Sequence, residues 1–167
     1  ACAISAAALK AGGEAIEPGI TTAEIDKIIY DFIVRHGARP NFLHLYGFPA
    51  TACISVNDTV IHGIPNKQQQ IRPGDIVSID TGCKIDGFNG DNACTYACGK
   101  IDLEAQRLLD VTKESLHRGI EMACGGNRVG DIGHAVQSYV EENGFSVVRT
   151  FVGHGVGKEL HEDCLLY

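Results

Sequence analysis

The chain has 167 residues, of which 44% are apolar and 21% are charged, and its formal net charge is −7. This length and apolar share suffice for one globular domain with a hydrophobic core. The acidic balance, with no basic tract, argues against nucleic-acid binding, and no apolar run reaches the length of a membrane span. We therefore expect neither nucleic acid nor a membrane as a partner.

The cysteines and the N-terminus indicate a cytoplasmic protein. Seven cysteines are scattered along the sequence without a Cys-x-x-Cys pair, which argues against a disulfide framework or a thiolate zinc site. The sequence starts in a helical pattern, and we expect no signal or targeting segment. A reducing cytoplasm is therefore the expected compartment.

Two helices are expected in the first part of the chain. Residues 1–16 are rich in alanine, and Pro18 and Gly19 break the helical pattern. Thr22 is predicted to cap a second helix, which Gly37 ends. The apolar stripe of this helix repeats at helical spacing and consists of Ile25, Ile28, Ile29, Phe32 and Ile33.

Loops and strands are expected next, followed by a second helical region. Residues 38–50 predict a loop, and a turn at Asn57-Asp58 is predicted to join two strands. Away from the central hairpin, the expected elements are strands near 52–56, 59–62 and 146–152, a polar connection at 62–75, and helices near 103–123 and 129–143.

A β-hairpin with two aspartates occupies the centre of the sequence. Residues 75–81 alternate and are rich in β-branched side chains, which is typical of a strand, and residues 88–98 form the returning strand. The dipeptide Asp86-Gly87 between them favours a two-residue turn, because glycine adopts a positive φ without strain. This turn pairs Ile85 with Phe88 and so determines the register of the hairpin.

In that register Asp80 faces Ala93 and Asp91 faces Gly82, so the two carboxylates are diagonal neighbours on one face. A slip of one residue would place them on opposite faces. The small residues beside them are expected to leave room for ions. Two carboxylates on one face repel each other without a cation, which favours a metal site over the alternative, a pair of solvated surface aspartates.

Glycines and apolar residues of the expected helices recur along the chain at an offset of 107 residues, which suggests an internal duplication. Pseudo-repeat halves of about 1–100 and 101–167 would each contain two helices followed by strands, and the site would lie between them. The alternative is two unrelated helix pairs whose glycines happen to have the same spacing. The aligned pairs are Leu9 with Leu116, Gly12 with Gly119, Gly19 with Gly126, Ile25 with Ile132, Ile33 with Val140 and Gly37 with Gly144.

Three histidines stand in positions suited to a functional site. His154 lies between two glycines in FVGHGVG, where the absence of side chains permits close approach by a ligand or by backbone. His62 is expected at a strand end before a Gly-Ile-Pro turn, and His161 follows His154 by seven residues. An imidazole together with two carboxylates is a suitable ligand set for divalent metals.

Four segments carry a resemblance to a known family. They are PGITTAEID (18–26), GFPATACISVNDTVIHGIP (47–65), RPGDIVSIDTGCKIDGFNGDNACTY (72–96) and FVGHGVGKELHE (151–162). In the order and spacing of these segments the sequence resembles the type I methionine aminopeptidases, which belong to the pita-bread metallopeptidases. The resemblance implies an α+β, creatinase/aminopeptidase-like fold, in which duplicated helix-helix-strand halves surround an antiparallel sheet in a single domain over residues 1–167.

The resemblance also implies a role for each matched position. Asp80 would chelate one metal ion, Asp91 would bridge two, and His154 would supply an imidazole ligand. His62 would hydrogen-bond the substrate or its leaving amine, and His161 would contact the substrate carbonyl and its developing oxyanion. The pocket for the methionine side chain would be lined by Phe42, Phe48 and Cys53, for which ordinary core packing is the alternative.

The implied reaction is removal of the N-terminal methionine from nascent peptides by water that two divalent metal ions activate. The ligands suit cobalt, manganese, iron(II) or zinc. The implied protein is a cytoplasmic monomer, and contact with the ribosome is left open. A peptidase that cleaves before proline is disfavoured by the HGIP segment.

One part of the family pattern has no match. The family places two glutamate ligands after the segment that ends in HE, and no residue of this sequence corresponds to them. We therefore expect a truncated member whose fold is incomplete at the C-terminus, with an exposed sheet edge and marginal stability. Such a chain alone would be an inactive enzyme, or would be a non-catalytic pita-bread module that binds peptides or proteins.

Overall fold

The computed structural model describes residues 1–166, which form two compact units. The first unit consists of Ala1–Ile101 and Val156–Leu160, and the second consists of Asp102–Gly155 and the chain from His161 onward. Over residues 1–166, no helix is both long enough and apolar enough to cross a membrane.

The first unit begins with two helices, α1 (Cys2–Glu14) and α2 (Thr22–Arg35). Thr21 caps α2, because its hydroxyl accepts from the Glu24 backbone at 3.2 Å while the Glu24 carboxylate accepts from the Thr21 backbone at 2.9 Å. The predicted cap at Thr22 was wrong by one residue. Thr22 is the first helical residue, and its buried hydroxyl exchanges hydrogen bonds with the backbone of Asn66.

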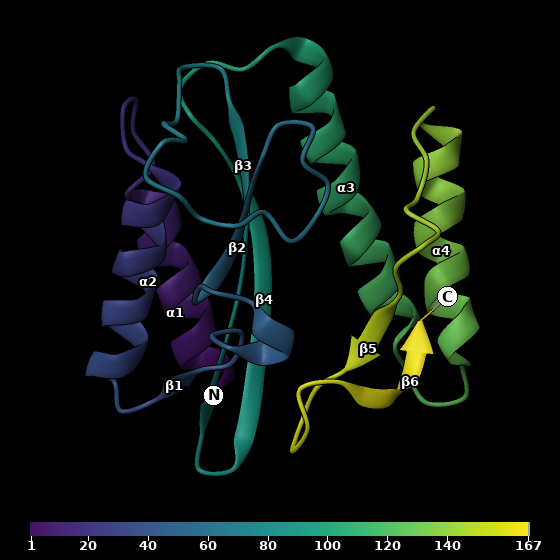
Figure 1. Cartoon of the computed structure of the whole chain (residues 1–167). Coiled ribbons are helices and arrows are strands. Elements are labelled where there is room, and N and C mark those ends of the chain that lie inside the picture. Colours follow the sequence, from purple (N-terminus) through teal and green to yellow (C-terminus); the bar gives the residue numbers. More distant parts are fainter. Residues whose placement is uncertain (167) are drawn as a thin grey trace. The chain divides into compact units, whose positions relative to one another are not determined.

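A four-stranded antiparallel sheet forms the centre of the first unit (Figure 1). β3 (Ile76–Ile85) pairs along its full length with β4 (Phe88–Ala97) on one side. On its other side β3 pairs with the short β1 (Arg39–Pro40) and with β2 (Ala52–Val56). A single turn of 3-10 helix, η1 (Leu45–Gly47), lies in the loop between β1 and β2.

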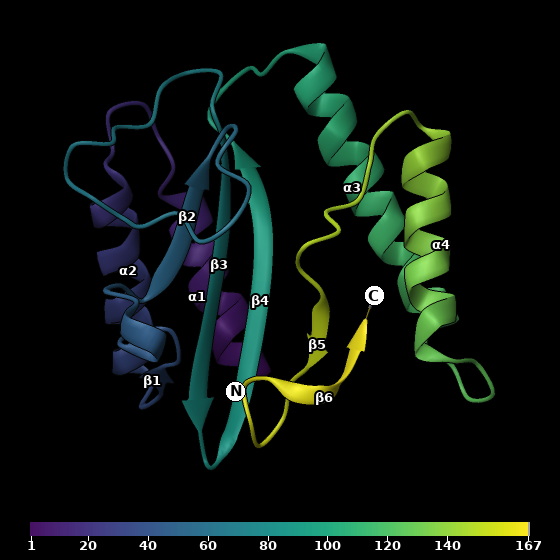
Figure 2. The ribbon, with the colours of Figure 1, turned by 45° about the vertical axis from the view of Figure 1, so that its right-hand side comes forward.

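The hydrophobic core of the first unit lies between this sheet and its two helices, which cover the same face of the sheet (Figure 2). Residues at odd positions of β3 point into the core, so the even positions lie on the opposite face. Each large apolar side chain buried here contributes about 1.5–3 kcal/mol. The fully buried members include Ala8, Ile25, Ile29 and Ile33 from the helices and Ala52, Val77, Ile79 and Cys83 from the strands.

The strand predicted near 59–62 was wrong, because both edges of β2 have other partners. β3 pairs with one edge of β2, and on the other edge the Ile54 backbone donates to the Gly63 carbonyl at 2.9 Å. The chain turns at Asn57, whose side chain bonds Asp75 and the Ile76 backbone at 2.9 and 3.0 Å. Residues 59–62 therefore form a loop.

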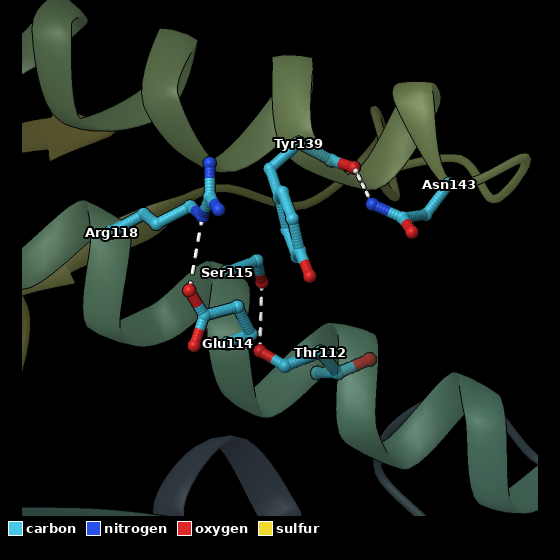
Figure 3. A network of polar contacts seen from close by, with 6 residues as sticks. All are labelled: Thr112, Glu114, Ser115, Arg118, Tyr139 and Asn143. Carbon is cyan, nitrogen blue, oxygen red and sulfur yellow. Dashed lines mark hydrogen bonds and ion pairs between the residues drawn. The ribbon is translucent and has the colours of Figure 1, made fainter.

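The second unit contains α3 (Leu103–Met122), α4 (Val129–Glu142), β5 (Gly153–Gly155) and β6 (Glu162–Leu166). The two helices lie side by side, and the guanidinium of Arg118 connects them (Figure 3). It pairs with Glu114 at 3.1 Å within α3 and lies 3.9 Å from the ring centre of Tyr139 on α4. This cation–π contact adds about 0.5–1 kcal/mol to the helix packing.

The strand predicted near 146–152 was also wrong, because regular pairing starts only at Gly153. There β5 pairs with β6 in an antiparallel arrangement, with Gly155 opposite Glu162. Within the described chain no strand pairs with residues 146–152, and a strand without a partner gains no ladder hydrogen bonds.

Candidate metal centre

The hairpin of β3 and β4 has the register expected from its turn. Asp86 and Gly87 both adopt left-handed backbone angles, with φ of 53° and 82°, which is the geometry of a two-residue hairpin turn. Asp91 therefore lies opposite Gly82, two positions from Asp80 on the same strand face. The prediction that the two carboxyl groups are diagonal neighbours is confirmed.

The two aspartates lie on the face of the sheet that α1 and α2 leave uncovered. Cys53 of β2 lies directly opposite Asp80 on this face and is buried. Gly82 was expected to leave room for ions because it is small, but the space beside it is already filled. A Cβ atom at Gly82 would lie 3.3 Å from the Phe42 ring and 2.9 Å from the Gly90 carbonyl, so the missing side chain is needed for close packing.

Burial and the neighbouring carboxyl group of Asp91 change the acidity of Asp80. Burial, followed by the charge and the hydrogen bond of Asp91, raises the pKa of Asp80 to about 7. Burial and the negative charges of Asp80 and Asp91 raise the pKa of the Cys53 thiol to about 12. Near neutral pH the thiol is therefore protonated, and the two carboxyl groups are the ligands that would gain most from a cation.

Asp26 on α2 supports this part of the sheet. Its Oδ1 atom accepts hydrogen bonds from the backbone of Thr51 at 2.9 Å and Ala52 at 2.8 Å. These bonds fasten the start of β2, and thereby Cys53, to the helix layer. No local pattern marks this role, because the two partners lie 25 and 26 residues away in sequence.

In the second unit the structure brings His154 and His161 together. Their ring centres are 4.5 Å apart in an edge-to-face arrangement. His154 Nδ1 lies 3.0 Å from the Gly155 carbonyl oxygen. Because a carbonyl oxygen can only accept, Nδ1 is the donor, and in the neutral imidazole Nε2 then carries the lone pair that can bind a metal.

The remaining predicted site residues lie in loops of the first unit. His62 is exposed and has a left-handed φ of 59°. Phe42 is buried, with 8% of its surface exposed, whereas Phe48 is half-buried. Among residues 1–166, no group of three or more His, Cys, Asp or Glu side chains is gathered as a metal site would require. The ligand set of Asp80, Asp91 and His154 therefore stays a prediction.

A helix-covered antiparallel sheet with a half-buried carboxyl pair fits a metallopeptidase, and the chain belongs to metallopeptidase family M24, whose family model matches residues 1–167. A methionine aminopeptidase of Clostridium perfringens is 54% identical over 150 residues, which are 90% of this chain and 60% of that protein. The expected family is thus confirmed, and the chain spans about 60% of the length of this relative.

Solved structures confirm the expected pita-bread fold. The crystal structure of methionine aminopeptidase from Rickettsia prowazekii matches with a TM-score of 0.95 and 37% identity, over 98% of this chain and 65% of that chain. A prolidase from Pyrococcus furiosus matches with a TM-score of 0.87 and 23% identity, over 99% of this chain and 48% of that chain. The likeness to the prolidase concerns the fold alone.

Proposed function

We propose that this chain acts as a metal-dependent aminopeptidase that removes the N-terminal methionine of peptides. The adjacent carboxyl groups of Asp80 and Asp91 on one face of the hairpin carry the proposal. The identity of 54% to a methionine aminopeptidase supports the choice of substrate. The proposed setting is a cytoplasmic monomer that acts on nascent chains, at the ribosome or away from it.

Two divalent metal ions are the proposed cofactor, with Asp80, Asp91 and His154 as ligands from this chain. The aspartates suit this role because they lie side by side and repel each other when both are ionised. When bound, the ions would activate a water molecule and polarise the scissile carbonyl. Carboxylate and imidazole donors without a thiolate suit manganese, iron(II), cobalt or zinc.

His62 and His161 are proposed to contact the substrate during the reaction. His62, exposed on its loop, is proposed to hydrogen-bond the substrate amide and then the leaving amine. His161 is proposed to donate a hydrogen bond to the oxygen that gains negative charge, and its ring is already oriented against His154. A single donor of this kind is worth about 3–4 kcal/mol in the transition state.

The proposed pocket for the methionine side chain lies beside the aspartates. Phe42 contacts the hairpin at Gly82, and Cys53 lies opposite Asp80. With Phe48 they are proposed to line an apolar, polarisable surface, to which an unbranched thioether is well matched.

Release of methionine from a Met-Ala-Ser peptide, with added cobalt or manganese, tests the proposal. We expect release by a version of the chain extended with a segment that supplies the two glutamate ligands of the family, and little release by the chain alone. In the extended version Asp80→Asn should lose at least about 100-fold, with Asp110→Asn unchanged, because Asp110 is an exposed residue of α3. Metal binding at Asp80 without any methionine release would instead favour the non-catalytic peptide-binding module. Absence of both metal binding and release would overturn the proposal.

A further inference from the structure

Asn41 carries a buried hydrogen-bond donor that the fold does not use. The residue directly follows β1, and its backbone N–H donates to the Gly82 carbonyl of β3 at 3.0 Å. Within the described chain its side-chain Nδ2 atom is buried and has no hydrogen-bond partner. Burying a donor in this way costs free energy of folding, and native proteins rarely keep such a group without a functional reason.

The amide nitrogen of Asn41 lies on the same face of the sheet as the aspartate pair. A Cβ atom on Gly82 would project to this face, because Gly82 and Asp80 are two positions apart on β3. That Cβ atom would lie 3.2 Å from Asn41 Nδ2 and 3.3 Å from the Phe42 ring. The amide and the ring therefore flank one point of this face, and all four residues belong to the first unit.

Asn41 adds a strong hydrogen-bond donor to the groups proposed for the methionine pocket. Phe42 and Phe48 offer ring carbons, and the Cys53 thiol, on the same face opposite Asp80, is a weak donor. The methionine side chain has one heteroatom, the thioether sulfur, which is a weak acceptor. Of these side chains, the Asn41 amide is the one that best complements that sulfur.

We propose that Asn41 is a specificity-determining residue, whose side-chain amide donates a hydrogen bond to the thioether sulfur of the bound methionine. An unbranched alkyl side chain of the same length would fill the pocket equally well but would leave the buried donor without an acceptor. This inference rests on the proposed function, because it concerns how the same pocket selects its substrate.

Release of the first residue from Met-Ala-Ser and from norleucine-Ala-Ser peptides tests this role, in the version of the chain that is extended with the glutamate segment. Norleucine has a methylene group in place of the sulfur and nearly the same shape. We expect the unaltered protein to prefer methionine in kcat/KM. The ratio of the two kcat/KM values should fall by about 3- to 10-fold in Asn41→Leu, which removes one hydrogen bond to a weak acceptor.

The ratio compares two substrates in one protein sample, so a partial loss of folded protein does not change it. Asn127→Leu is the matched control, because Asn127 is an exposed asparagine whose amide donates to the Met122 carbonyl at 3.0 Å. Its ratio should equal that of the unaltered protein. If Asn41→Leu fails to fold, Asn41→Ala removes the same donor and should lower the ratio in the same way.

The outcomes separate this inference from the proposed function. Methionine release with an unchanged ratio in a folded Asn41 variant would overturn the inference and leave the proposed function intact. Absence of methionine release by the unaltered extended protein would overturn both.

Thermal unfolding of the chain without substrate provides a second measurement. Because the Asn41 amide has no partner in the fold, Asn41→Leu should unfold at the same temperature as the unaltered chain or at a higher one. Asn92→Leu is the comparison, because the Asn92 amide donates to Ser5 on α1 at 2.8 Å, and it should unfold at a lower temperature. An equal fall in Asn41→Leu would show that the Asn41 amide stabilises the fold and would overturn the inference.

Discussion

The carboxyl groups of Asp80 and Asp91 show how two ordinary side chains acquire unusual properties from their position. Both follow from a strand pairing that places them on one face, next to the buried Cys53. Burial and repulsion raise the pKa of Asp80 to about 7, from 3.8 for an exposed aspartate. A divalent cation would relieve this repulsion, which is the physical reason for proposing a metal at this point.

The raised pKa predicts how the stability of the metal-free chain depends on pH. The folded state holds the Asp80 proton more tightly than the unfolded state does. The free energy of unfolding should therefore fall as the pH rises from about 4 to about 7 and level off above that, with a slope of at most about 1.4 kcal/mol per pH unit. Urea melts across this range, with a chelator present, measure the slope.

Asp91→Asn is the comparison variant for this pH dependence. It removes the second charge and keeps the shape, so the slope assigned to Asp80 should become smaller. An unchanged slope in Asp91→Asn would mean that other groups cause the pH dependence.

At the scale of the elements, helix packing in both units depends on glycines at points of close approach. A Cβ atom on Gly12 of α1 would lie 2.7 Å from Ile29 of α2, and one on Gly119 of α3 would lie 2.9 Å from Val136 of α4. Gly119 follows Gly12 by 107 residues, and Val136 follows Ile29 by 107 residues. This spacing is the offset of the predicted duplication. The recurrence supports that duplication, which stays a prediction.

A second glycine of α1 allows an element-scale prediction. A Cβ atom on Gly13 would lie 2.1 Å from the ring of Tyr96 on β4. Gly13→Ala should therefore destabilise the chain by about 1–3 kcal/mol through overpacking, although alanine is the better helix former.

Gly130→Ala on α4 is the control, because a Cβ atom there meets nothing within 4 Å. It should stabilise by about 0.5–1 kcal/mol. Denaturant melts of both variants measure these changes, and a stabilising Gly13→Ala would contradict the packing of α1 on the hairpin.

At the scale of the whole molecule, the first unit is built from two separate chain segments, a long one that ends at Ile101 and a short one, Val156–Leu160. The two candidate histidines flank this short segment, whereas the two aspartates lie on a continuous hairpin. The proposed metal site therefore depends on chain segments that are distant in sequence, and metal binding should be coupled to folding.

This coupling predicts a stabilising effect of metal ions. Mn²⁺ at about 100 times its dissociation constant should raise the free energy of unfolding by about 2.7 kcal/mol. The gain should be abolished by a chelator and lost in Asp91→Ala, but retained in Asp110→Ala, which alters an exposed residue of α3. Thermal melts with and without Mn²⁺ make the comparison. An equal gain in Asp91→Ala would place the bound metal elsewhere.

Short-range interactions explain what the sequence by itself determined. The family resemblance, the hairpin register and the approximate bounds of the four helices follow from motifs, turn residues and periodicity, all of which act between residues close in sequence. The cap of α2 was misplaced by one residue because two threonines stand side by side, and the glutamate three residues after Thr21 decides between them.

Only the tertiary structure decided which distant segments meet. The extra strand near 59–62 was wrong because β3 and the backbone at Gly63 occupy the two edges of β2, and Gly82 is small because Phe42 packs against it. Asp26 reaches backbone groups 25 and 26 residues away, and Asn89 reaches carbonyls 68 and 69 residues away. Local patterns do not encode such contacts, because they depend on the order in which strands and helices pack and on the free energy of burying each polar group with its partner.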